Sequence, residues 1–247
     1  MAIEYYKGYT NIVQIHNNLV EAQYKFTREQ QLILLQVAKT LQETDIYDKY
    51  SYMKVEYQVS ELQSLLNIPD NRTIRGVIKS LQRCIMSYEN LEEQWEEDVV
   101  VFVSARYYTG GHIEIEIHQN MLPFFKKLNE HYTKLNMKEI VRFKSQYSIR
   151  IYELARKLQH LKEPKKKEQV YTIDEFQKMV GSSFKTWQHI KDKVLEPAKE
   201  EINGHSRVYF DYAPIESYKK GQTRGRKGFN QIKIIMNIEG HYQAKLL

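Results

Sequence analysis

The sequence of 247 residues predicts an α+β fold made of two tandem winged-helix domains that are related by internal duplication. Three observations predict this fold class. The chain repeats itself at an interval of about 115 residues, each repeat has the same order of helical and strand patterns, and each repeat closes with two alternating β patterns. We place the first domain at residues 1–135 and the second at residues 136–247.

The repeat is clearest in two pairs of segments. YQVSELQSLLN (57–67) matches YTIDEFQKMVG (171–181), with Tyr, Glu and Gln at corresponding positions. Upstream, FTREQQLILLQVAKTL (26–41) matches FKSQYSIRIYELARKL (143–158). The offsets differ by a few residues, as short loop insertions produce, so we interpret the chain as a tandem duplication.

Each repeat predicts the same elements in the same order. A long amphipathic helix is followed by a short strand, at about 27–42 and 53–58 and again at about 144–160 and 168–172. Next come a helix with Ser60 or Asp174 as its N-cap and, after a short turn, a second helix at about 71–86 or 184–203. A β-hairpin closes each repeat. This order is the winged-helix plan, in which the second helix of the pair usually enters the DNA major groove; the alternative is a helix pair that only packs.

The composition is that of a soluble folded protein, with 42% hydrophobic and 28% charged residues. No apolar run approaches the roughly 20 residues that span a bilayer, and the N-terminus lacks the apolar core of a signal peptide, so we expect no membrane association. The single cysteine, Cys84, excludes an internal disulfide and a Cys-rich zinc site. We therefore expect a cytoplasmic protein in which Cys84 is buried within a helix.

Motifs of several enzyme classes are missing from the sequence. GQTRGRKG lacks the spacing and the hydroxyl residue of a phosphate-binding P-loop, and the eight histidines include no HEXXH pair. A nicking replication enzyme would need a His-hydrophobic-His signature beside a nucleophilic tyrosine, which is also missing. We expect a protein that is not an enzyme and that needs no cofactor and no metal.

Charge divides the chain into two unlike halves. Residues 1–135 contain 14 Lys and Arg against 18 Asp and Glu, a net charge of −4, whereas residues 136–247 contain 23 against 13, a net charge of +10. The basic half favours a polyanionic partner, and the acidic half requires a different explanation.

The helix predicted at 184–203 is the main candidate for reading DNA. Its apolar residues recur every three or four positions, which leaves the polar residues of its first half exposed. These can hydrogen-bond base edges or phosphates, and they are Lys185, Thr186, Gln188, His189, Lys191 and Lys193. The lysines lie at the end of the helix dipole that favours acids, which suggests that this end faces phosphate. The alternative is a solvated face without a partner, and Pro197 either kinks the helix or restarts it.

The hairpin after this helix carries a second basic cluster. SYKKGQTRGRKGFN (217–230) contains no acid and five bases, which are Lys219, Lys220, Arg224, Arg226 and Lys227. A basic wing tip suits contact with phosphates or with the minor groove, and the alternative is a loop that is merely soluble. PKKKE (164–168) is a weaker cluster of the same kind.

The first repeat is acidic where the second is basic. SYENLEEQWEED (87–98), which leads into its hairpin, has six acids and no base, and would repel a phosphate backbone. The recognition-like helix of this repeat still offers five residues for a secondary DNA contact, namely Arg72, Thr73, Arg75, Lys79 and Arg83. We therefore expect the second domain to anchor on DNA, and the first to make protein contacts together with a weaker DNA contact.

Three segments, in order along the chain, carry a family resemblance: NNLVEAQYKFTREQQLILL (17–35), SQYSIRIYELARKL (145–158) and IKDKVLEPAKEEIN (190–203). They resemble the replication initiator (Rep) proteins of theta-replicating bacterial plasmids with iterons at the origin. The third segment is the most specific, because Val-Leu-x-Pro-Ala precedes Glu-Ile-Asn in it. GRK (225–227) also fits, whereas the final strand, IKIIMNI, lacks the aromatic residue that is common there.

The resemblance implies two winged-helix domains related by pseudo-symmetry. Monomers of such proteins bind direct repeats in double-stranded origin DNA, help to melt an adjacent AT-rich segment, and recruit host initiator and helicase proteins. Dimers, formed largely through the first domain, bind an inverted repeat at the operator and repress the protein's own gene.

Two other functions stay open. A winged-helix transcriptional regulator would bind an operator without supporting replication. A nicking enzyme of rolling-circle replication is disfavoured by the missing histidine pair, and a relaxed or nicked product from supercoiled origin DNA would be its signature.

Overall fold

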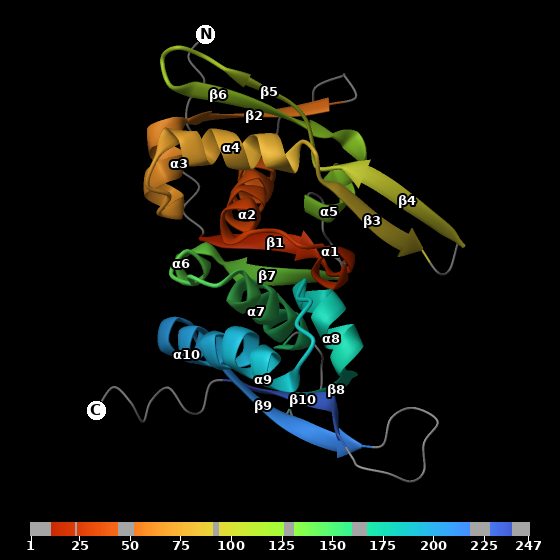
Figure 1. The fold of residues 1–247 in the computed structure, drawn as a ribbon. Helices are drawn as coiled ribbons and strands as arrows, with labels where there is room; N and C mark the ends of the chain where they lie inside the picture. Colours follow the sequence, from red (N-terminus) through yellow and green to blue (C-terminus); the bar gives the residue numbers. More distant parts are fainter. Residues whose placement is uncertain are drawn as a thin grey trace. The chain divides into compact units, whose positions relative to one another are not determined.

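The computed structural model describes residues 11–22, 24–43, 52–90, 94–125, 131–159, 167–217 and 228–238. The chain forms two compact units. The first comprises Met1–Ala22 and Phe26–Val141, and the second comprises Gln23–Lys25 and Arg142–Leu247 (Figure 1). Each unit has a buried apolar core of its own.

Helix α2 (Arg28–Glu43) forms the core of the first unit. Thr27 and Gln30 make a capping box at its start, since the Gln30 N–H donates to Thr27 Oγ1 at 3.3 Å and the Thr27 N–H donates to Gln30 Oε1 at 2.7 Å. Its apolar residues are at most 2% exposed on every side of the helix: Leu32, Ile33, Leu34, Leu35, Val37, Ala38 and Leu41. Apolar residues on every side of its middle turns require that these turns are enclosed, and α2 contacts α3, α4, α5, β1 and β2.

A three-stranded antiparallel sheet carries the winged-helix elements of this unit. Its order is β2–β6–β5, formed by β2 (Tyr52–Gln58), β5 (Phe102–Tyr107) and β6 (His112–His118). Helices α3 (Val59–Leu66) and α4 (Asn71–Leu81) follow β2, and the β5–β6 hairpin is the wing. Along β6 the buried isoleucines alternate with half-exposed polar residues, so one face of the sheet meets the core.

The first unit also contains elements that the sequence analysis missed. β1 (Ile12–His16) pairs with β7 (Tyr132–Asn136), and β3 (Ile85–Asn90) forms a hairpin with β4 (Trp95–Val100). The short helices of this unit are α1 (Asn17–Glu21), η1 (Gln119–Met121), α5 (Leu122–Phe125) and α6 (Met137–Ile140). The acidic segment 87–98 therefore does not only lead into a hairpin; most of it lies in the additional hairpin β3–β4 (Figure 1).

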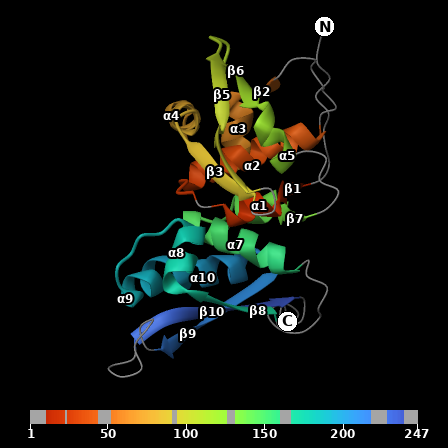
Figure 2. The ribbon, with the colours of Figure 1, turned by 90° about the vertical axis from the view of Figure 1, so that its right-hand side faces the viewer.

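The second unit repeats the winged-helix plan. Helix α7 (Gln146–Gln159) precedes β8 (Lys167–Thr172), and α8 (Ile173–Val180) follows. The recognition helix consists of α9 (Trp187–Ile190), the π-helical turn η2 (Lys191–Leu195) and α10 (Glu196–His205). Strands β9 (Val208–Ser217) and β10 (Gly228–Ile238) form the wing. The helices cover one face of the sheet, as Figures 1 and 2 show.

The two units share their sheet topology, and this confirms the predicted fold class. In each, the strand that precedes the helix pair lies at an edge and the last strand lies in the centre, in the orders β2–β6–β5 and β8–β10–β9. The first helix of each pair ends at a left-handed residue, Asn67 with φ 52° and Gly181 with φ 73°. These two residues are the last of the matching segments 57–67 and 171–181.

Some predicted details are wrong. Ser60 is not an N-cap, because α3 begins one residue before it, at Val59. Asp174 is not one either, because Thr172 caps α8 in a capping box with Glu175. Helix α4 ends at Leu81 rather than at 86, since the chain enters β3 at Ile85.

Cys84 consequently lies in the connection between α4 and β3. It is half-buried rather than buried, and burial raises the pKa of its thiol. Its expected place inside a helix is therefore wrong.

None of the helices in the described ranges is long and apolar enough to cross a membrane. Within the same ranges, no three His, Cys, Asp or Glu side chains form a group that could hold a metal ion.

Candidate nucleic-acid interface

The recognition helix of the second unit begins at Trp187, not at 184. Thr186 has extended backbone angles, and its hydroxyl accepts the His189 N–H at 3.3 Å, so it is the N-cap. Lys185 lies just before the cap. The helix starts later than its apolar period predicts because the cap, and not the periodicity, determines the first turn.

Most of the predicted DNA-reading side chains of this helix face solvent. Lys185, His189 and Lys193 are exposed, and Lys191 is half-buried. Gln188 is also exposed, but its amide donates to both carboxylate oxygens of Asp192, at 2.9 and 2.8 Å. An i, i+4 pair of this kind stabilises the helix and would have to open before Gln188 could bind a base.

Pro197 lies in the first turn of α10, directly after the π-helical turn. The Glu196 N–H donates to the Lys191 carbonyl, five residues earlier, as in a π-helix. The wider turn relieves the crowding that a proline ring imposes on the carbonyl four residues before it, and the first turn of a helix tolerates a missing N–H. The π-helical turn therefore lets the helix continue through Pro197, which lies in the first turn of α10.

The acidic second half of the recognition helix makes contacts within its own unit. Tyr212 of β9 donates its hydroxyl to Glu196, and Lys199 pairs with Asp211 of β9 at 2.7 Å. Burial, followed by the bond to Glu196, raises the pKa of Tyr212. Glu201 accepts the backbone N–H groups of Lys144 and Ser145, at 3.0 and 3.2 Å, just before α7. An isolated helix would be destabilised by bases in its first half and acids in its second half. These contacts within the unit explain why the acids lie in the second half.

The basic residues predicted at the wing tip lie outside the described residues. They are Lys219, Lys220, Arg224, Arg226 and Lys227. The structure describes β9 up to Ser217 and β10 from Gly228, so these bases stay a prediction about the segment that joins the two strands.

In the first unit, α4 contains four of the five predicted residues and presents three of them to solvent, whereas Arg83 lies beyond its last residue, Leu81. Arg72, Arg75 and Lys79 are exposed, whereas Thr73 is half-buried. The Thr73 N–H and hydroxyl donate to the two carboxylate oxygens of Asp70, at 2.8 and 2.9 Å. These bonds hold the pKa of the Asp70 carboxyl below its usual value. Thr73 therefore has a partner within the helix cap already.

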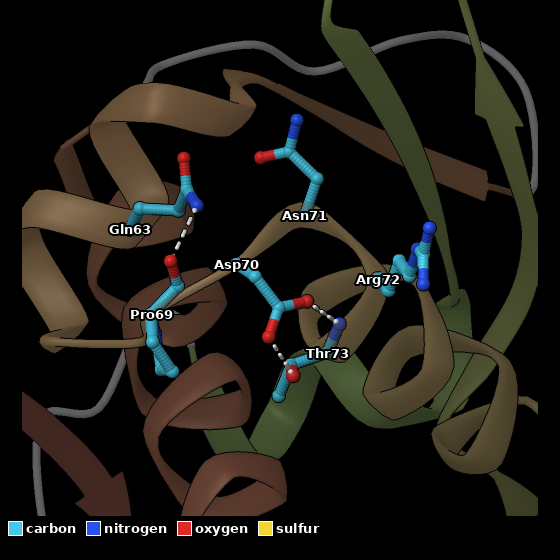
Figure 3. Close-up of a pocket in the computed structure, with 6 residues that line it drawn as sticks. All are labelled: Gln63, Pro69, Asp70, Asn71, Arg72 and Thr73. Carbon is cyan, nitrogen blue, oxygen red and sulfur yellow. Dashed lines mark hydrogen bonds between the residues drawn. The ribbon is translucent and has the colours of Figure 1, made fainter.

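An open pocket lies at the turn between α3 and α4, and Asp70 is at its centre (Figure 3). Its lining is polar apart from one proline: Gln63, Pro69, Asp70, Asn71, Arg72 and Thr73. Gln63 donates to the Pro69 carbonyl at 3.4 Å, which ties the end of α3 to this turn. The sequence analysis missed Asp70, although an Asp directly before a helical pattern is a common N-cap signal.

The first wing is short, and the basic residues in it and beside it are engaged. Arg75 of α4 lies over the ring of Tyr107 of β5, 4.6 Å from its centroid. Arg106 pairs with Glu114 across the wing at 2.9 Å, and Lys54 pairs with the same carboxylate at 3.4 Å. The tip closes tightly, since the Gly111 N–H donates to the Tyr108 carbonyl. Sequence patterns could not find these pairs, because they join residues from different strands or from a helix and a strand.

Two family models match the chain in succession. Residues 12–156 match the model described as Initiator Replication protein, WH1, and residues 172–236 match Initiator Rep protein, WH2. The chain belongs to the initiator replication (Rep) protein family. The Rep resemblance found in the sequence is thereby confirmed.

One curated protein and one solved structure are similar to this Rep protein. A replication initiation protein of Escherichia coli is 19% identical over 196 residues, which are 78% of this chain and 62% of that protein, so the chain spans less than two thirds of its length. The Pi initiator protein, solved in complex with iteron DNA, is 16% identical with a TM-score of 0.66, over 93% of this chain and 98% of that chain. This second likeness shows a shared fold.

Proposed function

We propose that this Rep protein initiates plasmid replication by binding direct repeats in origin DNA through its two winged-helix units. The proposal rests on one observation: each unit has the same strand order and contains one capped recognition helix and one wing. A protein with two such units can contact two segments of one binding site.

The second unit is the principal DNA-binding part in this proposal. Lys185, just before the N-cap, and His189, in the first turn, are exposed at the start of the recognition helix, which is the part that usually reaches base edges. The five bases of segment 217–230 would add phosphate contacts, which supply affinity without reading sequence. The exposed Arg72, Arg75 and Lys79 of α4 would add the secondary contact of the first unit.

The first unit would also mediate self-association. Ile85 and Val100 are directly opposite each other on β3 and β4, and they are 59% and 38% exposed. A two-stranded hairpin with an exposed apolar pair is a surface that a second copy can cover. The dimer would bind an inverted repeat at the operator and repress the protein's own gene, whereas the monomer would open the origin and recruit host initiator and helicase proteins.

Footprinting on the DNA that flanks the protein's own gene tests the proposal. Protection of several direct repeats, together with replication of a plasmid that carries them, is the expected result. Protection of an operator alone, with no support of replication, would indicate a transcriptional regulator instead. Incubation with supercoiled origin DNA and a divalent metal provides a second test, because a nicked or relaxed product would contradict a function by binding alone.

A further inference from the structure

An aromatic cluster joins the start of the recognition helix to the base of the wing in the second unit. Trp187, the first residue of α9, lies against Phe229 of β10, with ring centroids 5.4 Å apart and ring planes at 36°. The Trp187 ring also meets Tyr212 of β9 edge-on, at 6.3 Å. Rings at these separations attract one another beyond the apolar area that they bury.

A β-bulge is what brings Phe229 to the helix. Ile232, Ile234 and Met236 of β10 are buried beneath the helices, so strict alternation would turn Phe229 to the opposite face of the sheet. The pairing of β10 with β9 shifts between Phe229 and Gln231, so that these two residues are opposite the consecutive residues Glu216 and Ile215 of β9 and Asn230 is the extra residue of the bulge. One extra residue reverses the alternation, and Phe229 therefore faces Trp187.

The cluster is not needed to fill the core. Phe229 is 40% exposed, and Trp187 is only half-buried, whereas the core residues of the same strand are at most 3% exposed. The first unit joins its recognition helix to its wing by a different contact, that of Arg75 in α4 with Tyr107 in β5, the counterpart of β9. In both units, then, a side chain of the recognition helix contacts an aromatic residue on a strand of the wing.

We propose that Trp187 and Phe229 are positioning residues, which hold the base of the wing against the start of the recognition helix so that both meet DNA as one surface. This role rests on the proposed function. It requires no contact of either ring with DNA. If Trp187 and Phe229 have this role, the contribution of a basic residue of the wing, such as Arg226, to DNA binding depends on Phe229, although Phe229 carries no charge.

A double-substitution experiment tests this dependence. The probe is a duplex that the full chain selects from a random-sequence pool, and a scrambled duplex of equal composition is its reference. F229A, R226A and the double variant F229A/R226A are compared by their dissociation constants over a range of salt. V170A is the matched control, because Val170 is an exposed apolar residue of the same sheet, 47% exposed, and pairs with Lys233 on the outer face.

We expect F229A to weaken binding to the selected duplex about tenfold with only a small change in melting temperature, since the ring is 40% exposed and lies outside the core. In that background R226A should have little further effect. V170A should bind like the wild type. The positioning role would be overturned if the increases in dissociation constant caused by F229A and R226A multiplied in the double variant. It would also be overturned if F229A bound the duplex as tightly as the wild type.

A fluorescence measurement separates this result from a failure of the proposed function. In a W95F background Trp187 is the remaining tryptophan, because the chain has two. Its emission should move to longer wavelength in F229A without DNA, as the indole loses its ring contact; unchanged emission would contradict the contact itself. A wild-type protein that prefers no duplex would instead overturn the proposed function, and the role of the pair in DNA binding with it.

Discussion

The recognition helix of the first unit ends after 11 residues at Leu81, whereas that of the second unit continues from Trp187 through the π-helical turn to His205. In the first unit the chain then forms the additional hairpin β3–β4 before it reaches the wing, and in the second it passes directly from α10 to β9. The two units have the same winged-helix topology, but they differ in the length of the recognition helix and in the additional hairpin. Duplication has preserved the strand order that encloses each core, while the exposed residues have diverged.

The electrostatic contacts of the two units differ in the same way. In the first, Arg106 and Arg75 are held by Glu114 and Tyr107, and an acidic hairpin follows α4. In the second, Lys185, His189 and Lys193 are exposed, while two acids of α10, Glu196 and Glu201, bind β9 and the segment before α7. The start of the second recognition helix thus exposes basic residues, and its acidic half is partly engaged within the unit. This contrast supports a division of labour, and it can be tested.

The largest expected effect concerns the buried charges of α7. Arg150 and Glu153, both 1% exposed, are hydrogen-bonded to each other, and Arg150 also donates to Tyr24 at 2.6 Å and to the Met179 carbonyl. Arg150→Ala should lower the free energy of unfolding by about 3–5 kcal/mol, because it leaves a buried carboxylate without its partner. Chemical denaturation measures this loss.

The first unit supplies the control for that change. Its corresponding residues in α2 are Ile33 and Gln36, so the double variant R150I/E153Q gives the second unit the residues of the first. It should be less destabilised than Arg150→Ala. If it is destabilised more, the two cores are not equivalent.

The next effect concerns the recognition helices. Lys185→Ala combined with His189→Ala should weaken specific DNA binding by about 1–3 kcal/mol for each lost base contact. Arg72→Ala combined with Arg75→Ala is the matched change in the first unit and should cost less. Titration of a selected duplex compares the two pairs. A greater loss from the second pair would reverse the assignment of the anchoring unit.

The third effect compares the two left-handed helix ends. Gly181→Ala should destabilise the fold by at least about 2 kcal/mol, because left-handed backbone strains any Cβ. In addition, this Cβ would lie 2.6 Å from the Tyr24 carbonyl oxygen. Asn67→Ala also places alanine in left-handed backbone but introduces no new contact with a carbonyl oxygen. The melting temperature should therefore fall less in this variant than in Gly181→Ala. Equal losses would show that the Tyr24 contact is not significant.

The smallest effect concerns the wings. Arg226→Ala should weaken binding to all sequences and reduce the slope of log affinity against log salt by about one, as the loss of one phosphate contact does. Arg106→Ala in the first wing should leave the slope nearly unchanged, because Arg106 is paired with Glu114. Equal changes of slope would mean that both wings contact phosphate alike.

The shared architecture of the two units could be predicted from the sequence. Apolar spacing, strand alternation and the repeat at about 115 residues identified the helices and strands that the two winged-helix units have in common, because burial imposes periods that can be read along the chain. The same patterns placed Lys185 and His189 at the start of an exposed helical face. The distribution of charged residues along the chain showed that the first half is acidic and the second half is basic.

The contacts of these elements, in contrast, follow from how the folded chain packs. The end of α4, the hairpin β3–β4, the π-helical turn before Pro197 and the bulge at Asn230 all depend on hydrogen bonds or pairings that periodicity does not encode. The partners of Glu196, Glu201 and Arg75 come from elements distant in sequence. Local periodicity shows that a side chain is exposed or buried, but its partner is selected by the packing of elements that meet only in the folded chain.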